Sequence, residues 1–592
     1  MWLAARYSLA FCLKHNKHDT TVRLIISGTS TLVLYLMIQA TGAVINAVQH
    51  AHGNPHVLWL PSAFFVAVLF VDLLCNRALA YYQSKWSHEL RAASRHDLDV
   101  HRGTLDVACF TSKRYDDLDK QIRELPYGWH TRVNFSEQML TIFSLLISFV
   151  LFGGALLWYK PMYAFVLLAV AIPKMISEFS LVSMWWALYE EHVPHHKIQN
   201  MLLKPLKNST AFVQAKIFNQ MNALNMILWS REERVINTYN QARREVARKK
   251  ISTSILAILG LGVVIFHASW TTIVTGGAIG TLSVILASAR TFQGNLNSIM
   301  MLMAEQWNSA KGVILIERDF KGLKPALVTL DPVTPDFKNP HLRFDRVSFA
   351  YPSEPEKEVL HEVSFDIEAG TKVAIVGQSG NGKSTVQALT MRHFDPTKGA
   401  IYADDINLQN IEPAVWNTYI CSLTQDYTIL ERLVGEEIAS SRLDEDADLE
   451  RIRESAEFAH FHEVALEDPY GYEKQIGSDF GGREFSGGEK QRLALARMHY
   501  RNTPIIILDE PDARLDPDSA DRIMHNIFAI KDKTVIIITH HVSRAEHCDK
   551  VIVMGKGVVA EQGSPADLMT SGGAYARMCE SDKKRLGSNA EA

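Results

Sequence analysis

The most informative stretch of this 592-residue sequence reads Gly377-Gln378-Ser379-Gly380-Asn381-Gly382-Lys383-Ser384-Thr385. It fits the pattern G-x-x-x-x-G-K-[ST], in which glycines let backbone N–H groups turn towards phosphate oxygens. Lys383 is placed to reach the β- and γ-phosphates of a nucleotide, and the Ser384 hydroxyl is placed to ligate Mg²⁺. The run Lys372–Val376 predicts a buried strand, and Val386–Met391 predicts a helix start whose positive end faces the phosphates. Together these features predict a nucleoside triphosphate site.

A second pair of candidate residues follows another apolar run. Residues 505–508 are apolar and predict a buried parallel strand, and Asp509 and Glu510 come directly after them. We interpret Asp509 as a ligand of Mg²⁺ and Glu510 as the general base that polarises the attacking water. A buried strand with a charged end is the alternative, but a phosphate-binding loop earlier in the same chain favours the catalytic interpretation.

Between these motifs the sequence reads Phe485-Ser486-Gly487-Gly488-Glu489-Lys490-Gln491-Arg492. A Ser-Gly-Gly turn before helix-forming residues predicts a second helix N-terminus that can bind an anion. The three motifs together resemble those of ABC ATPases, whose signature motif is Leu-Ser-Gly-Gly-Gln followed by a basic residue and Gln-Arg. Phe485 and Glu489 depart from that pattern, whereas Ser486 and the two glycines match it.

The resemblance implies roles for residues elsewhere in the chain. It implies that Tyr351, which lies 26 residues before Gly377, stacks on the adenine ring; a tyrosine of the apolar core is the alternative. It implies that Gln425 contacts Mg²⁺ and the attacking water and senses the membrane domain. His540, at the end of a predicted strand, corresponds to the histidine that contacts the γ-phosphate.

One segment departs from the family more strongly. After Glu-Pro-Thr the family usually continues Ser-Ala-Leu-Asp, whereas this chain has Asp512-Ala513-Arg514-Leu515-Asp516 after Glu510 and Pro511. Leu515 and Asp516 keep the pattern. The departure affects the expected communication between two ATP sites and leaves the expected ATP binding unchanged.

The predicted site residues fall into three groups. The predicted catalytic residues are Glu510, His540 and Gln425. The predicted nucleotide-binding residues are Tyr351, Gly377, Gln378, Ser379, Gly380, Asn381, Gly382, Lys383, Ser384, Thr385, Ser486, Gly487, Gly488 and Asp516. The predicted Mg²⁺ ligands are Ser384, Gln425 and Asp509.

Charge divides the chain near residue 330. Residues 1–330 carry 32 Lys and Arg against 20 Asp and Glu, whereas residues 331–592 carry 29 against 45. The basic part also holds six apolar segments that are long enough, or nearly so, to cross a bilayer, which takes about 20 residues. They are Leu24–Val48, Val57–Leu74, Met139–Trp158, Met162–Tyr189, Ile251–Thr272 and Gly277–Met303. We therefore predict a membrane domain over residues 1–330 and an ATP-binding domain over residues 331–592.

Loop charges predict the orientation of the membrane domain. The loop Gln49–His56 contains no Lys or Arg, whereas Lys85–Arg132 and Lys197–Lys250 are rich in both, which places the long loops and the ATPase in the cytosol. The long polar gaps resemble the cytosolic helical extensions of ABC exporters. By that resemblance, two coupling helices lie near Ser112–Asp119 and Lys207–Gln214.

The expected fold is therefore a six-helix membrane domain of ABC exporter type followed by an α/β P-loop domain. The expected function is an ATP-driven exporter or flippase for a hydrophobic or amphipathic substrate, with ATP and Mg²⁺ as cofactors. The resemblance implies two half-transporters, and the presence of every hydrolytic element favours an identical partner. The expected place is a cell membrane, plasma or inner, with the ATPase domain in the cytosol.

Other functions stay open at this point. An importer on the same scaffold and a non-transporting ATP-gated channel or regulator are the main alternatives. A soluble ATPase acting on DNA or ribosomes is disfavoured by the six apolar segments. The acidic balance of residues 331–592 also argues against a nucleic acid partner.

Overall fold

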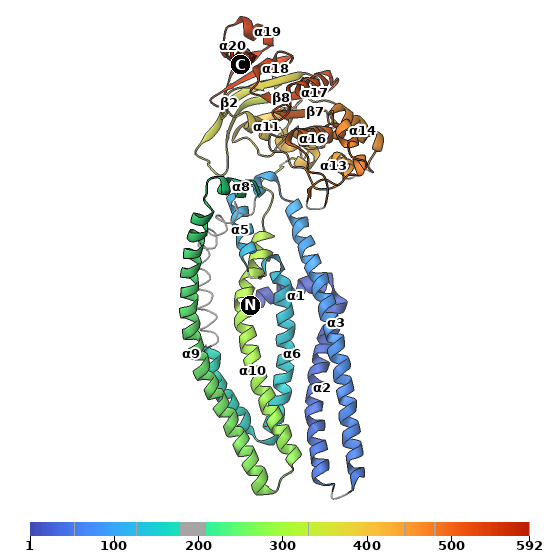
Figure 1. Cartoon of the computed structure of the whole chain (residues 1–592), viewed down its shortest axis with the longest axis vertical. Helices are drawn as coiled ribbons and strands as arrows, with labels where there is room; N and C mark the ends of the chain where they lie inside the picture. The colour runs from blue at the N-terminus through green and yellow to red at the C-terminus, as the bar shows by residue number, and fades with distance from the viewer. Residues whose placement is uncertain are drawn as a thin grey trace. The chain divides into compact units, whose positions relative to one another are not determined.

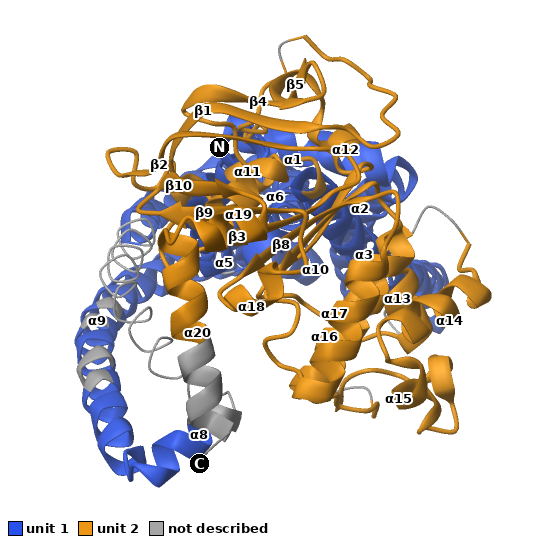
Figure 2. Cartoon of the chain, turned by 90° about the horizontal axis from the view of Figure 1, so that it is seen from above, with its two compact units in different colours: residues 1–102, 117–322 blue, residues 103–116, 323–592 orange. Residues whose placement is uncertain are grey.

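The computed structural model describes residues 1–51, 54–125, 127–177, 209–329, 331–442, 446–478 and 481–590 (Figure 1). The chain divides into two compact units, which Figure 2 distinguishes by colour. Unit 1 comprises Met1–Arg102 and Asp117–Gly322, and unit 2 comprises Gly103–Asp116 and Leu323–Ala592. The domain boundary near residue 330 stays a prediction.

Unit 1 is helical throughout its described part (Figure 1). Its elements are α1 (Trp2–His15), α2 (Lys17–Gln49), η1 (Pro55–Leu58), α3 (Trp59–Gly103), α5 (Lys113–Glu124), η2 (Gly128–His130), α6 (Thr131–Tyr159), an unlabelled helix Pro161–Ser177, α8 (Ser209–Ile217), α9 (Met221–Thr275), α10 (Ile279–Ile314) and the π-helix η3 (Leu315–Phe320). The two longest helices, α3 and α9, each combine an apolar segment with a polar extension.

Four described helical segments are long and apolar enough to cross a membrane. They are Lys17–Gln49, Pro55–Gly103, Gly128–Tyr159 and Ile236–Thr275. Each contains one of the six predicted segments in whole or in large part. The other two predicted segments lie on the shorter apolar helix Pro161–Ser177, beyond which Met162–Tyr189 leaves the described residues, and on α10. Unit 1 thus has the helices of a multi-pass membrane protein, and the count of six stays a prediction.

Small residues let α2 and α10 approach closely. A Cβ on Gly42 would lie 2.9 Å from the carbonyl oxygen of Gly280, and a Cβ on Gly280 would lie 2.0 Å from that of Gly42. The Gly280 N–H donates to the Asn46 side chain at 2.7 Å. Close backbone contact of this kind is typical of helices in lipid, where burial of apolar surface alone does not hold helices together.

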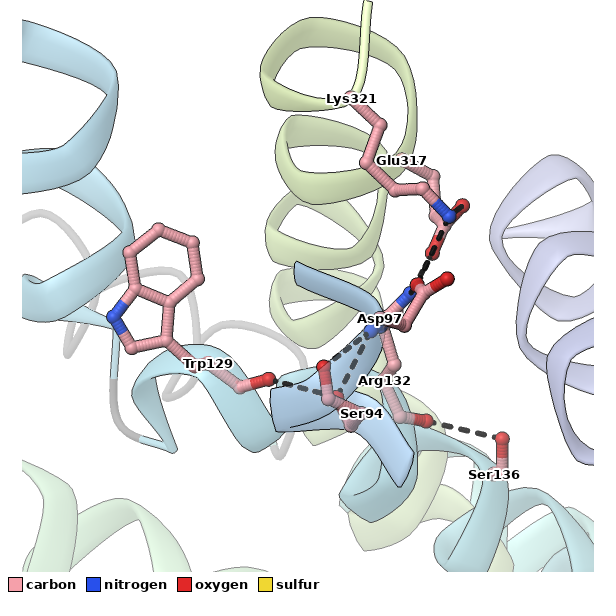
Figure 3. Close-up of polar contacts among 7 residues, drawn as sticks. All are labelled: Ser94, Asp97, Trp129, Arg132, Ser136, Glu317 and Lys321. Carbon is pink, nitrogen blue, oxygen red and sulfur yellow. Dashed lines mark hydrogen bonds and ion pairs between the residues drawn. The ribbon is translucent and has the colours of Figure 1, made fainter. Parts of the chain in front are cut away.

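A buried charged cluster joins three elements of unit 1, α3, α6 and η3 (Figure 3). Arg132 on α6 has no exposed surface and forms ion pairs with Asp97 of α3, at 2.9 Å, and with Glu317 of η3. Its guanidinium also donates to the carbonyl oxygen of Ser94 at 3.0 Å and lies over the Phe11 ring of α1. The cluster fixes the end of α10 to the helices beside it, because each partner satisfies a charge that burial would otherwise make costly.

Unit 2 contains a six-stranded sheet in the order β10-β9-β3-β8-β7-β6 and a four-stranded antiparallel sheet in the order β2-β1-β4-β5. The strands are β1 (Leu342–Ala350), β2 (Glu358–Ile367), β3 (Lys372–Val376), β4 (Lys398–Ala403), β5 (Ile406–Asn407), β6 (Ile420–Leu423), β7 (Ile505–Asp509), β8 (Thr534–Thr539), β9 (Lys550–Gly555) and β10 (Val558–Gly563). In the larger sheet all neighbouring strands are parallel except β9 and β10.

The helices of unit 2 are mostly short. They are α4 (Val107–Phe110), α11 (Lys383–Thr390), η4 (Leu408–Asn410), α12 (Pro413–Trp416), α13 (Val434–Ala439), η5 (Ser440–Arg442), α14 (Leu449–Phe458), α15 (His462–Leu466), η6 (Gly471–Glu473), α16 (Gly487–Arg501), α17 (Pro517–Ala529), α18 (Val542–Ala545), α19 (Pro565–Thr570) and α20 (Ala574–Ala590).

The central parallel strands are apolar on both faces because each face carries its own core. Val376, Leu508 and Ile537 belong to the core that includes α16 and α17. Their neighbours along the strands, such as Ile375 and Ile507, belong to the core shared with the antiparallel sheet. Successive side chains of a strand point to opposite faces, so these runs leave polar groups only at the strand ends. The fold thereby collects the predicted polar residues at one edge.

A short segment from the N-terminal part of the chain belongs to unit 2. Asp106 caps α4 by accepting from the Cys109 N–H at 2.7 Å, and its other oxygen accepts from the Leu327 N–H at 2.6 Å. The predicted coupling helix Ser112–Asp119 overlaps α5 and the edge of this segment. In the second predicted coupler, Lys207 and Asn208 lie outside the described residues, and α8 begins at Ser209. Both couplers stay predictions.

Candidate ATP site

The phosphate-binding loop connects β3 to α11, as its sequence predicted. Gly377 has a φ of 153°, and a Cβ there would lie 2.4 Å from the Met554 carbonyl oxygen. Gly382 has a φ of 93°, and a Cβ there would lie 2.5 Å from the Leu360 side chain. Both the backbone conformation and the lack of space therefore require glycine at these two positions.

Lys383 lies across its own loop. Its Nζ donates to the Gly377 carbonyl at 2.7 Å and to the Gln378 carbonyl at 3.1 Å. Burial lowers the pKa of Lys383, and the nearby Glu510 and Asp509 carboxylates oppose that shift. Among the described residues Lys383 forms no direct ion pair, and a cation beside a glycine loop fits the phosphates of a nucleotide.

The loop is fixed from outside by Asn381. Its side-chain NH₂ donates to the Met554 carbonyl at 3.0 Å, and its carbonyl accepts from the Lys556 N–H at 3.2 Å. Asn381 was predicted to bind nucleotide, and its side chain is engaged with the β9–β10 turn. Nucleotide contact by Asn381 stays a prediction.

Three adjacent strands bring the predicted catalytic residues together. Gln425 follows β6, Glu510 follows β7 and His540 follows β8, and β8 lies next to β3, which carries the phosphate-binding loop. His540 Nδ1 lies 2.8 Å from Glu510 Oε1, and Gln425 Nε2 donates to Glu510 Oε2 at 3.4 Å. A carboxylate held on both sides in this way is suited to orient and deprotonate a water molecule.

Asp509 is buried beside these groups. It is 8% exposed, and among the described residues no side chain donates a hydrogen bond to its carboxylate. Burial and the charge of Glu510 raise the pKa of Asp509 to about 6, although Lys383 opposes the shift. An uncompensated buried carboxylate of this kind fits a divalent cation. The Mg²⁺ ligand set of Asp509, Ser384 and Gln425 stays a prediction; all three carry the oxygen donors that Mg²⁺ prefers.

The signature segment forms the start of α16. Ser486 is the N-cap and accepts from the Glu489 N–H at 3.3 Å, while the Glu489 carboxylate accepts from the Ser486 N–H at 2.7 Å. This capping box works with either Glu or Gln at its third helical position, which explains why Glu489 is tolerated there. Arg483 pairs with Glu489 at 2.7 Å and balances its charge.

Two predicted nucleotide contacts have other partners in the structure. Tyr351 Oη lies 3.1 Å from Thr385 Oγ1, and its ring packs edge-on against Phe349 and Phe394. Asp516 is the N-cap of α17 and accepts from the Ser519 N–H at 3.0 Å. Adenine stacking by Tyr351 and nucleotide contact by Asp516 stay predictions.

One residue of the site was not assigned a role from the sequence. The Gln491 NH₂ donates to the carbonyl oxygens of Glu510, at 3.2 Å, and Pro511, at 2.5 Å, and its own oxygen accepts from the Arg514 N–H at 3.1 Å. Gln491 belongs to the Gln-Arg pair that follows the signature glycines, and this position was the only signal. It joins the signature helix to the turn that follows Glu510.

Comparison with known proteins matches the same part of the chain to one family. Residues 360–513 match the ABC transporter family. The chain is 32% identical over 345 residues to the mitochondrial potassium channel ATP-binding subunit of Xenopus tropicalis, covering 54% of the chain and 48% of that relative. It is 31% identical over 368 residues to the mitochondrial iron-sulfur clusters transporter ATM1 of Chaetomium globosum, covering 59% of the chain and 60% of that relative.

A bacterial lipid A-core flippase from Chromohalobacter salexigens is 34% identical over 238 residues, which cover 40% of either chain. The chain thus spans about half the length of the curated relatives it matches. The solved structure of a bacterial Atm1-family ABC exporter with ATP bound superposes with a TM-score of 0.73 at 22% identity, covering 96% of this chain and 98% of that one.

These matches define the class of protein. Residues 360–513 of unit 2 are an ABC transporter ATP-binding domain, and the chain as a whole resembles ABC exporters. Within that class it has the fold of an exporter-type half-transporter, in which one helical membrane domain is fused to one ATP-binding domain.

Proposed function

We propose that this chain is one half of an ATP-driven exporter or flippase that moves a hydrophobic or amphipathic substrate across a membrane. One observation carries the proposal: Glu510 lies between His540 and Gln425 at the sheet edge that also holds the phosphate-binding loop. A hydrolytic site with all its parts on a membrane scaffold fits a transporter that consumes ATP.

The proposed hydrolysis uses side chains that are already positioned. Lys383 exchanges the carbonyl oxygens of its loop for the β- and γ-phosphates. Glu510 accepts a proton from the attacking water, while His540 and Gln425 hold the carboxylate and the water in place. Mg²⁺, when bound, neutralises charge that develops on the phosphate oxygens.

The proposed assembly is a homodimer with two equivalent ATP sites. The chain holds both a phosphate-binding loop and a complete signature turn, so a second copy supplies everything that a composite site requires. In that arrangement the Ser486–Gly488 turn of one subunit faces the nucleotide held by the other. The altered segment after Pro511 keeps a heterodimer as the alternative, and mass measurement of the chain purified alone distinguishes the two.

The substrate class and the membrane are also part of the proposal. Large apolar side chains such as Leu60, Phe70 and Ile258 are exposed along α3 and α9, which suits helices in contact with lipid. The relatives include proteins whose names describe a lipid flippase and multidrug exporters. We place the protein in a plasma or inner membrane with unit 2 in the cytosol; the mitochondrial relatives make an organelle membrane the alternative.

A second candidate function is an ATP-gated channel or a regulatory subunit. The relative named as the ATP-binding subunit of a mitochondrial potassium channel favours it, since that match extends over 54% of the chain. An importer on the same scaffold differs only in the direction of flux.

Inside-out vesicles containing the purified chain separate these functions. For the exporter or flippase we expect ATP-dependent movement of a fluorescent phospholipid or an amphipathic dye, and no movement with the Glu510→Gln variant. ATP-dependent K⁺ conductance without turnover of the hydrolytic site would favour the channel. Movement in the opposite direction would favour the importer.

A further inference from the structure

Arg514, the most unusual residue of the segment after Glu510, has a defined partner. Its guanidinium lies over the ring of Tyr427, 5.4 Å from the ring centre. Tyr427 is two residues beyond Gln425, and its hydroxyl donates to the carbonyl oxygen of Gly487 at 3.1 Å. A Cβ on Gly487 would lie 3.8 Å from Arg514 Cδ, so the arginine side chain also passes beside the signature turn.

The backbone of this segment is held on both sides of Arg514. Gln491 accepts from the Arg514 N–H at 3.1 Å, and a Cβ on Gly488 would lie only 3.0 Å from the Arg514 carbonyl oxygen. Asp512 pairs with Arg544 at 3.2 Å, and Arg544 also pairs with Asp521 at 2.7 Å. The position of the Arg514 side chain is therefore set by fixed backbone, and its contact with Tyr427 is part of a defined turn.

A small cavity lies beside this connection. This cavity, of about 50 Å³, lies between the segment after β6, the start of α16 and the segment after β7, and its lining includes Gln425, Gln491 and Glu510. That volume has room for a water molecule or two. Tyr427 packs on the apolar core that includes α16, and Arg497 of α16 donates to the Thr428 carbonyl oxygen at 2.9 Å. At the N-terminal end of α16, beside the cavity, the contacts of Tyr427 and Arg514 add a direct connection to the signature turn.

We propose that Tyr427 and Arg514 form a positioning pair that makes the segment after Gln425 and the signature turn move together. The proposal rests on the proposed function, in which that turn meets the nucleotide of the second subunit. Gln425 lies in the segment expected to respond to the membrane domain. Through Tyr427, a displacement of that segment moves Gly487 directly; through Arg514, the same displacement reaches the turn that follows Glu510.

The pair acts without touching nucleotide in the phosphate-binding loop of its own chain. Its loss therefore leaves nucleotide binding to that loop intact and lowers turnover, because the signature turn is presented less often. One exposed hydrogen bond contributes about 0.5–1.5 kcal/mol, which corresponds to roughly a threefold to tenfold change in rate.

The test compares Tyr427→Phe, Arg514→Ala and the double variant in the full-length chain reconstituted in nanodiscs. Tyr427→Phe keeps the ring and removes only the donor to Gly487. We expect each single variant to lower kcat for MgATP about threefold to tenfold, while the Kd of a fluorescent ATP analogue changes less than twofold. Since the two residues act as one unit, the kcat of the double variant should be no lower than that of the less active single variant.

A second pair of the same chemistry provides the control. Arg343 lies over the Tyr402 ring at 4.6 Å in the antiparallel sheet, so Arg343→Ala and Tyr402→Phe should leave kcat unchanged. Arg514→Lys keeps the charge and should recover part of the lost rate, which a purely structural role would not require.

Three outcomes would overturn the pair. If both single variants have wild-type kcat, the pair has no role in turnover. If the losses of the two single variants multiply in the double variant, the two residues act independently. A fall in kcat that follows a fall in Tm shows a structural role alone. Failure of the proposed function looks different, because the wild-type chain would then hydrolyse no ATP, or Glu510→Gln would hydrolyse it at the wild-type rate.

Discussion

Arg132 in unit 1 and Lys383 in unit 2 are both cations close to two carboxylates, but their charges are balanced differently. Arg132 is fully buried and paired directly with Asp97 and Glu317. Lys383 is half-buried and donates only to neutral carbonyl oxygens, while the neighbouring Asp509 has a pKa raised to about 6. The first cluster is complete without a ligand, and the second becomes complete when phosphate and a metal ion arrive. The same residue types thus serve as a joint in one unit and as a binding site in the other.

The largest expected effect tests the incomplete cluster. Glu510→Gln removes the base but keeps hydrogen bonding to His540 and Gln425, so we expect turnover to fall by about 10²–10⁴-fold with ATP binding retained. Steady-state ATPase assays and nucleotide binding measure the two effects separately. Lys383→Ala is the matched variant, because it should weaken nucleotide binding instead. Wild-type turnover in Glu510→Gln would show that another group acts as the base.

A comparably large effect is expected in the complete cluster, but on stability. Arg132→Ala leaves Asp97 and Glu317 without their buried partner, which costs about 3–5 kcal/mol. Thermal unfolding of the detergent-purified chain should show a markedly lower Tm. Arg123→Ala is the control, since that side chain is 61% exposed beside Asp119 and should change the Tm little. An unchanged Tm in Arg132→Ala would show that the cluster does not hold the helices together.

A third basic group, also largely buried, has no carboxylate partner among the described residues. His499 on α16 stacks on Phe458 and lies 3.0 Å from Ser455 Oγ, and burial, together with the charges of Lys533 and Arg451, lowers the pKa of His499 to about 4. The unfolded chain, with a pKa near 6.5, binds more protons between about pH 4 and 6.5, so stability rises with pH across that window.

The pH dependence of His499→Phe checks this sign. Between pH 7 and pH 5 the wild-type chain should lose on the order of 2 kcal/mol of unfolding free energy that the variant does not lose. Denaturant titrations at the two pH values measure the difference. If both proteins lose the same amount, the histidine is not held neutral in the folded state.

The sequence was most informative where function and secondary structure use the same residues. Apolar runs that end at Glu510 and His540 predict strands, and the ends of parallel strands lie at one edge, so the meeting of these two residues follows from their positions. Gln425 was assigned through the family resemblance, and the strand β6 before it was not predicted. The membrane segments were predictable for a similar reason, since long apolar runs have few other uses.

Contacts between distant segments were not predictable in this way. Arg132 joins residues that are 35 and 185 positions away along the chain, and no local pattern indicates such a pairing. Tyr351 was interpreted as an adenine contact, and its hydrogen bond to Thr385 depends on how two separate loops pack. The segment Gly103–Asp116 carries no strong apolar pattern, so its membership of unit 2 emerges only from the folded chain.

The smallest expected effect concerns the frame around the incomplete cluster. Asn381→Ala removes two hydrogen bonds, to the Met554 carbonyl and from the Lys556 N–H, that fix the phosphate-binding loop against the β9–β10 turn. Because the loop must then be ordered on binding, we expect the KM for MgATP to rise about threefold to tenfold, with kcat within twofold of the wild type. Asn381→Asp keeps the acceptor for Lys556 and should give an intermediate KM. A fall in kcat at unchanged KM would contradict this interpretation. It would place Asn381 in the chemical step, although its side chain is bound to the β9–β10 turn in the structure.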